Sequence, residues 1–208
     1  MSTSNSNKNN HSSKFNLAGL WHGSVEMQEF LEFDCRGIGV HIGTYEQAKS
    51  AIEDLHKTKG RLIRVNARVL NPIRLPDMGD AWSSPIRMIT VIAQAMGSAS
   101  ATRGEWDIDK YDNIHKKIND EWNAAYLIAD KQVVKMKAFD DFTQIKHECA
   151  SRLVLQLNGF DGIIYANQYE GVLNKDDDSL LATPDKTSGD SYIVFTNEQI
   201  KIVRVYKD

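Results

Sequence analysis

The stretch Gly37-Ile38-Gly39-Val40-His41-Ile42-Gly43-Thr44 decides how the rest of the chain is interpreted. Its apolar residues recur with the two-residue period of a strand, so Ile38, Val40 and Ile42 face one side. The opposite side carries glycines and a single imidazole, that of His41. Glycine in a strand often marks the close approach of a ligand or of another backbone. The stretch therefore predicts a strand with one core face and one nearly bare face that carries His41.

The segments on either side predict strands towards both ends of the chain and helices in its middle. Residues 61–70 alternate cleanly, with apolar side chains inward and Arg64, Asn66 and Arg68 outward. Thr44 is the expected N-cap of the first helix. The remaining strands are predicted at 17–23, 160–165, 192–195 and 202–206, and the helices at 45–57, 86–96, 109–130 and 140–158. The prolines of 71–77 predict a loop. This order favours an α+β fold over a doubly wound sheet.

Composition limits the classes of protein that fit. Residues 1–15 contain little that packs, so we expect a disordered tail, followed by one domain over 16–208. The formal net charge of −3 gives no basic footprint across the domain, and nothing in it demands a nucleic-acid partner. Cys35 and Cys149 have neither the spacing of a metal site nor that of a disulfide framework. No apolar run of about 18 residues predicts a membrane span. We expect a cytoplasmic protein.

No familiar catalytic motif is present. The sequence lacks a P-loop, a zinc motif, a nucleophile elbow and the glycine fingerprint of dinucleotide-binding folds. Four isolated side chains remain as candidates: His22, His41, Glu170 and Asp190. Each also has a purely structural explanation, since a histidine at a strand end or a carboxylate in a loop is commonly structural.

The order of several short motifs carries a family resemblance. They are Leu20-Trp21-His22-Gly23-Ser24, then 37–42, then 159–165 with Asn167 and Glu170-Gly171, and finally Ser191-Tyr192-Ile193-Val194-Phe195 with Gln199. This set resembles the catalytic domain of poly(ADP-ribose) polymerases and their bacterial and phage relatives over residues 17–205. The resemblance implies an ADP-ribosyltransferase-like split β-sheet core with a central, mainly helical insert at 86–158. It also implies NAD⁺ as substrate and no metal.

The resemblance assigns roles to the first two motifs. His22 would bind the ribose next to nicotinamide, and the backbone of Gly23 would hold the carboxamide. His41 stands where the family usually has a tyrosine against the nicotinamide ring, and an imidazole can stack on that ring too. The neighbouring members of the expected NAD⁺ site are Trp21, Ser24, Gly39, Ser191 and Tyr192.

The last motif departs from the family. Many members have a glutamate where this chain has Ser191. Glu170 is the first candidate for the missing carboxylate and Asp190 the second, unless the acceptor supplies its own. Arg64 is a weaker candidate: its guanidinium could hold the NAD⁺ diphosphate, although a solvated strand face explains it equally simply.

The activity implied by the resemblance is mono-ADP-ribosyl transfer from NAD⁺ to a macromolecular acceptor, either protein or nucleic acid. Relatives of this kind act as toxins, effectors or phage-associated factors, which implies an antitoxin or immunity partner and, in some cases, delivery into a target cell by a specialised secretion system. NAD⁺ glycohydrolase activity is one alternative. A non-enzymatic NAD- or ADP-ribose-binding pseudo-transferase is another, favoured by Ser191. An RNA 2′-phosphotransferase should have more basic residues beside its histidines than Arg36.

Overall fold

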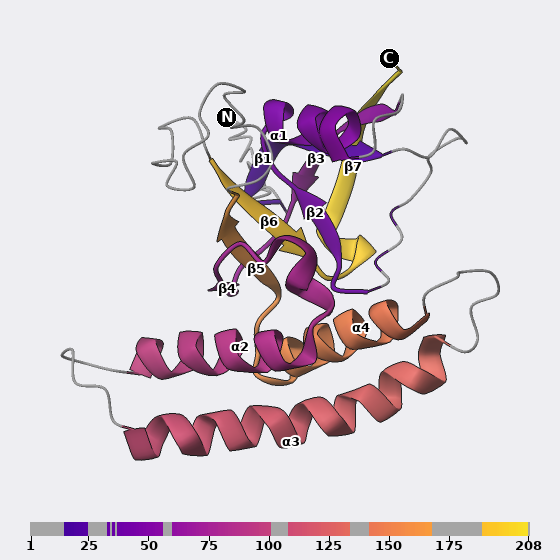
Figure 1. Ribbon diagram of the computed structural model, residues 1–208. Coiled ribbons are helices and arrows are strands. Elements are labelled where there is room, and N and C mark those ends of the chain that lie inside the picture. Colours follow the sequence, from indigo (N-terminus) through magenta and orange to yellow (C-terminus); the bar gives the residue numbers. More distant parts are fainter. Residues whose placement is uncertain are drawn as a thin grey trace, which may run out of the picture.

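The computed structural model describes residues 15–24, 33, 35, 37–55, 60–100, 108–133, 142–167 and 189–207. These residues form two β-sheets and a layer of helices, which confirms the predicted mixture of helices and strands (Figure 1). One sheet has the strand order β1-β3-β7, made of Leu17–Ser24, Arg61–Ala67 and Ile200–Lys207. The other has the order β2-β6-β5-β4, made of Val40–Ile42, Asp190–Val194, Gly162–Ala166 and Pro72–Arg74. Every strand pair is antiparallel except β4 with β5.

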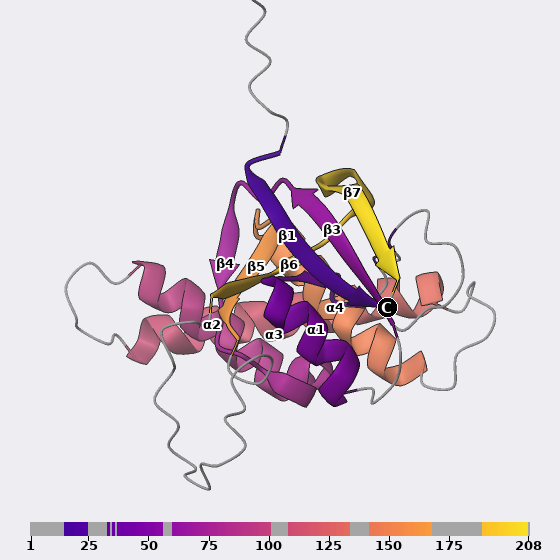
Figure 2. The ribbon, with the colours of Figure 1, turned by 90° about the horizontal axis from the view of Figure 1, so that it is seen from above.

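The two sheets pack face to face, and Figure 2 shows β1, β3 and β7 side by side. The alternation predicted for β3 is confirmed, because Ile63, Val65 and Ala67 are fully buried between the sheets. They meet Val40 and Val194 of the four-stranded sheet. Burying a branched aliphatic side chain contributes roughly 1.5–3 kcal/mol, so this apolar layer holds the sheets together.

Helices cover both outer sides of the paired sheets. The helix α1 (Tyr45–Ser50), continued by a π-helical turn at Ala51–Leu55, packs on the outer face of the three-stranded sheet through Ala48 and Ile52 against Leu62. Thr44 caps α1, as predicted, and accepts a hydrogen bond from the Gln47 backbone. The capped helix therefore begins directly after the β2 strand and its glycine.

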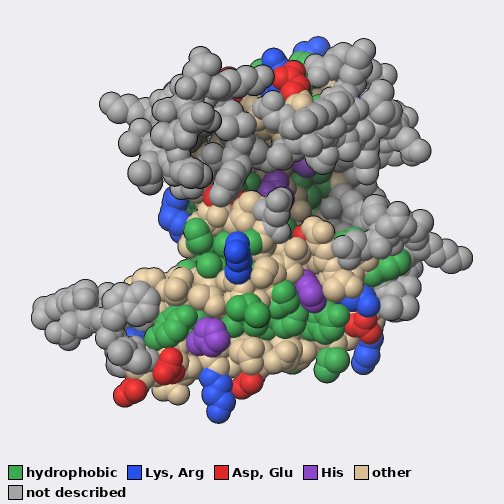
Figure 3. Space-filling model, viewed as in Figure 1, with side chains coloured by type: hydrophobic (Ala, Val, Ile, Leu, Met, Phe, Trp, Pro, Cys, Tyr) green, Lys and Arg blue, Asp and Glu red, His purple; other side chains and the backbone are tan. Residues whose placement is uncertain are grey.

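The helical layer comprises α2 (Pro85–Ser100), α3 (Ile108–Val133) and α4 (Phe142–Leu157), close to the predicted helices. It covers the face of the four-stranded sheet that is turned away from β1, β3 and β7. A short 3-10 helix at Gly79–Ser83 leads into α2. Hydrophobic side chains form a band along this layer on the face shown in Figure 3. Among the described residues, no helix combines the length and apolar character that a bilayer crossing requires.

Two local predictions were wrong. Residues 37–39 are not part of the strand, because Gly37 and Gly39 have φ angles of 64° and 133° and turn the backbone. Ile38 consequently lies in the core under the helical layer, while Val40 and Ile42 lie between the sheets. The second error is β4, which was predicted as a loop. A proline is tolerated there because β4 is an edge strand.

Residues 1–14, most of the expected tail, lie outside the described residues, as does the segment 168–188.

Candidate functional site

The two sheets join at one point on their edges. Trp21 of β1 and Gly43, which follows β2, exchange two backbone hydrogen bonds of 2.9 Å each. A cavity of about 170 Å³ opens beside this bridge and beneath the start of α1. It is lined by Trp21, His22, Gly23, His41, Ile42, Gly43, Gln47, Ala48, Ala51, Tyr165 and Ser191. Residues from widely separated parts of the chain therefore meet in one hollow.

His22 is held by the neighbouring strand. Its Nδ1 lies 2.7 Å from the backbone oxygen of His41. Because a carbonyl oxygen only accepts hydrogen bonds, Nδ1 carries the proton. Burial lowers the pKa of His22, so the imidazole is neutral at pH 7 and its Nε2 is an acceptor. The fold thus fixes one tautomer of this histidine.

His41 points to the face of β2 opposite that of Val40 and Ile42, towards the helical layer. Its Nδ1 lies 2.9 Å from the Tyr165 hydroxyl, and its ring packs edge-on against Tyr165 and Trp82, with centroid separations of 5.8 Å and 5.9 Å. Burial, with a smaller effect of the nearby His22, lowers the pKa of His41 to about 4. His41 is therefore a neutral, oriented ring at physiological pH.

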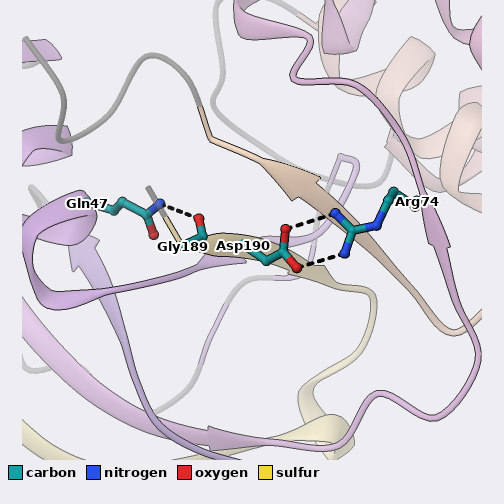
Figure 4. Close-up of polar contacts among 4 residues, drawn as sticks. All are labelled: Gln47, Arg74, Gly189 and Asp190. Carbon is teal, nitrogen blue, oxygen red and sulfur yellow. Dashed lines mark hydrogen bonds and ion pairs between the residues drawn. The ribbon is translucent and has the colours of Figure 1, made fainter. Parts of the chain in front are cut away.

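A buried polar network forms the floor of the site next to α1. Ser191 Oγ donates to Gln47 Oε1 at 3.0 Å and accepts from Asn167 Nδ2 at 3.2 Å. Gln47 Nε2 donates to the Gly189 backbone oxygen at 2.9 Å, a contact drawn in Figure 4. All three side chains are buried. The network ties α1 to the end of β5 and the start of β6, and it fixes Ser191 at the cavity.

Asp190 does not serve the cavity, contrary to one sequence-based candidate role. Successive side chains of a strand face opposite sides, so Asp190 points away from the face that carries Ser191. It instead forms two hydrogen bonds to Arg74, of 2.7 Å and 2.8 Å (Figure 4). The bonds from Arg74 hold the pKa of Asp190 below its usual range. This carboxylate is already engaged on the opposite face of the sheet.

The expected NAD⁺ site is brought together only in part. Trp21, His22, Gly23, His41 and Ser191 line the cavity.

The other expected members lie elsewhere. Tyr192 packs against the core between the sheets, and Ser24 is buried beyond the cavity at the end of β1. Gly39 lies against β6, where a Cβ atom would come within 2.5 Å of the Val194 backbone oxygen. Arg64 is exposed on the outer face of the three-stranded sheet. Glu170 lies outside the described residues.

Three polar side chains of the site were not among the predicted site residues. Gln47 is one of them, although the spacing of Thr44 and Gln47 matches a capping box, a signal that could have placed it near the strand end. Tyr165 and Asn167 were placed on or after a strand, but nothing in the local pattern shows that they meet His41 and Ser191.

Among the residues that the structure describes, no carboxylate lines the cavity and no three His, Cys, Asp or Glu side chains are grouped as metal ligands. The chain matches no protein-family model, no curated protein and no solved structure. The site is therefore interpreted from its own geometry and chemistry.

Proposed function

We propose that this chain has an ADP-ribosyltransferase fold and is a mono-ADP-ribosyltransferase, which binds NAD⁺ at the cavity and transfers ADP-ribose to a macromolecular acceptor. The observation that carries the proposal is the meeting of His22 of β1 and His41 of β2 at one cavity, beside the bridge that joins the two sheets. The resemblance of the surrounding motifs to that family supplies the identity of the ligand.

The size of the cavity supports a single aromatic ring as its occupant. An apolar cavity of roughly 150 Å³ can hold a benzene molecule, and this cavity measures about 170 Å³. Pockets for whole drug-sized ligands span roughly 300–1,000 Å³. The nicotinamide ring therefore fits inside, with the ribose at the mouth and the diphosphate and adenosine beyond it.

The two histidines suit the chemistry of nicotinamide release. When the bond between nicotinamide and the ribose C1′ breaks, nicotinamide leaves with the electron pair and the ribose becomes oxocarbenium-like. Neutral His22 presents Nε2 as an acceptor for a ribose hydroxyl, and neutral His41 adds no positive charge beside the developing cation. The acceptor then forms its bond to C1′ and loses a proton.

Glu170 is the proposed source of the stabilising carboxylate. It follows Asn167 by three residues, and three extended residues span at most about 11 Å. Asn167 bonds to Ser191 at the floor of the cavity. Chain length therefore allows the Glu170 carboxylate to reach the site.

Nicotinamide release from NAD⁺ by the purified full chain tests the proposal. His22→Ala should slow release by roughly 10²–10³-fold, the usual effect of removing one group that stabilises the transition state. Glu170→Gln should slow it in the same range. The matched control is His115→Ala, because His115 lies on α3, away from the cavity. Unchanged turnover of His22→Ala would refute the site assignment.

A binding-only pseudo-transferase is the second candidate, favoured by the absence of a carboxylate among the described residues that line the cavity. Calorimetric titration with NAD⁺ separates it from the enzyme: saturable binding without nicotinamide release, with protein and nucleic-acid acceptors added, identifies a binding protein. Free ADP-ribose that accumulates without any added acceptor identifies a glycohydrolase instead.

A further inference from the structure

The three-stranded sheet has a charge opposite to that of the whole chain. Its strands β1, β3 and β7 contain Arg61, Arg64, Lys201, Arg204 and Lys207 and no Asp or Glu. The complete chain has a formal net charge of −3. The net charge of the whole chain therefore does not indicate that this sheet is locally cationic.

Three of these cations lie on the outer face of the sheet. Ile63 and Val65 point inward, so Arg64 between them points outward. Arg204 lies directly opposite Arg64 in the β3–β7 register, and Lys201 lies opposite Asn66. All three cationic side chains are exposed, and none forms an ion pair with a described residue.

This arrangement carries a cost unless an anion is bound. Like charges directly opposite each other on neighbouring strands are destabilising. Arg64 and Arg204 form such a pair without a carboxylate from the described residues between them. A phosphate placed over the pair would convert this repulsion into two charge-assisted hydrogen-bonding contacts.

Aromatic rings connect the cationic face to the cavity. The Arg204 guanidinium lies over the Tyr206 ring, 4.8 Å from its centroid. Trp21, which lies opposite Arg64 in the β1–β3 register, packs against Tyr206 and Tyr45 with centroid separations of 5.2 Å and 5.1 Å. Trp21 also lines the cavity. The basic and aromatic side chains thus form a continuous path that ends at the proposed site of nicotinamide release.

We propose that single-stranded nucleic acid binds this outer-face patch, defined by Trp21, Arg64, Lys201, Arg204 and Tyr206, and is the acceptor of ADP-ribose. Cations that track phosphates together with aromatic rings that stack on bases are the two parts of a single-strand binding surface. An acidic peptide would use the cations but not the rings, and a duplex hides its base faces. The acceptor role rests on the proposed function, whereas the binding does not.

The transfer step balances with a base as nucleophile. A base nitrogen forms the bond to C1′ of the NAD⁺ ribose as the bond to nicotinamide breaks. Nicotinamide leaves as a neutral molecule with the electron pair, and the base nitrogen releases its proton to solvent. No oxidant or metal enters the balance.

The test is a fluorescence-anisotropy titration of a labelled single-stranded DNA of about 16 nucleotides, the upper end of common site sizes, with the full chain and without NAD⁺. Lys201→Glu/Arg204→Glu should weaken binding at least about ten-fold and reduce the dependence of log K on log salt by about 1.4, or 0.7 for each lost phosphate contact. Lys116→Glu/Lys131→Glu, on exposed positions of α3, makes the same change in net charge and should leave binding nearly unchanged.

Circular dichroism and melting temperature report whether each variant folds. If the charge-reversed double variant does not fold, Lys201→Gln/Arg204→Gln takes its place. Absence of binding by the parent chain at about 50 mM salt, an equal loss in the α3 variant, or equally tight binding of duplex DNA or polyglutamate would each overturn the proposal. Because NAD⁺ is absent, these outcomes are independent of nicotinamide release. Release without DNA binding refutes only this proposal. DNA binding without release refutes the proposed enzyme and the acceptor role with it, and leaves the nucleic-acid binding in place.

Discussion

The helical layer and the junction of the two sheets bury very different side chains. In the helical layer, Met88, Ile92, Ile118 and Leu155 are fully buried against one another and against the four-stranded sheet. The junction instead buries amide and hydroxyl groups and holds two histidines with lowered pKa values. Apolar burial stabilises a fold directly, whereas a buried polar group is tolerated only when it is hydrogen-bonded.

Stability and chemistry are therefore located in different parts of this molecule. The side chains of Gln47 and Asn167 both form hydrogen bonds with Ser191. These bonds fix the positions of the side chains and contribute little net stability. None of the described residues that line the cavity belongs to the helical layer. We infer that α2, α3 and α4 stabilise the four-stranded sheet, and that the sheet junction carries the function.

Truncating a core side chain of the helical layer should lower stability most, and it tests this division. Ile92→Ala removes a fully buried side chain from α2 and should lower the free energy of unfolding by about 2–5 kcal/mol. The kcat/KM for nicotinamide release should stay unchanged under conditions where the variant is folded, because Ile92 does not line the cavity. Urea unfolding and steady-state kinetics measure the two quantities. A large fall in kcat/KM with little loss of stability would break the division.

Most of the fold could be predicted from sequence because its elements are strongly periodic. The alternation of β3 and the helical spacing of α3 and α4 each identify an element without tertiary information. The turn at Gly37 and Gly39 could not be predicted, since the residues fit a strand pattern and only the positive φ angles break it. The short edge strand β4 contains a proline and has no pattern of its own.

The site was predictable only where a motif carried it. The ordered motifs indicated Trp21, His22, Gly23, His41 and Ser191, which the fold places around one cavity.

The rest of the site depends on register and on contacts between distant segments. Asp190 and Ser191 are adjacent in β6 and face opposite sides of the sheet. The register of this strand therefore determines that Ser191 faces the cavity and that Asp190 bonds to Arg74. Tyr165 meets His41 because β5 and β2 both pair with β6 and both side chains lie on the same face of the sheet.

A matched pair of glycine substitutions, one at the junction and one in the helical layer, tests the same division. In β1, a Cβ atom on Gly23 would lie 2.2 Å from the Ala48 backbone oxygen, so Gly23→Ala must displace α1 from the junction. We expect a loss of about 1–3 kcal/mol and weaker NAD⁺ binding, because α1 lines the cavity. In α2, the nearest described neighbour of a Cβ atom on Gly97 would be Ile114, at 3.9 Å. Gly97→Ala should therefore gain about 0.5–1 kcal/mol through helix propensity.

Thermal unfolding and NAD⁺ titration calorimetry distinguish the two glycines. Equal destabilisation by both substitutions would mean that the close approach of α1 to Gly23 has no special role. Destabilisation by Gly23→Ala alone, without a change in NAD⁺ affinity, would separate the packing of α1 from ligand binding and move the proposed nicotinamide site away from Gly23.

The pH dependence that the junction imposes should give the smallest of these losses of stability. The pKa of His41 falls from 6.5 to about 4 on folding, and that of His22 is also lowered. Between those pH values the unfolded chain binds more protons than the folded chain, so stability is fully present above about pH 7 and is lost as the pH falls through 6.5 towards 4. Solvent in the open cavity reduces the effect of this pKa shift on stability. We therefore expect His41 to account for a loss of about 1–2 kcal/mol in the free energy of unfolding between pH 7 and 5.

Urea midpoints at the two pH values measure this loss, and the double variant His22→Gln/His41→Gln should abolish most of it. His115→Gln, in the helical layer, is the control and should keep the pH dependence of the parent. If the double variant retains the full slope while the α3 variant loses it, the titrating group belongs to the helical layer. The two buried histidines of the junction would then not be the groups whose protonation lowers the stability of the fold.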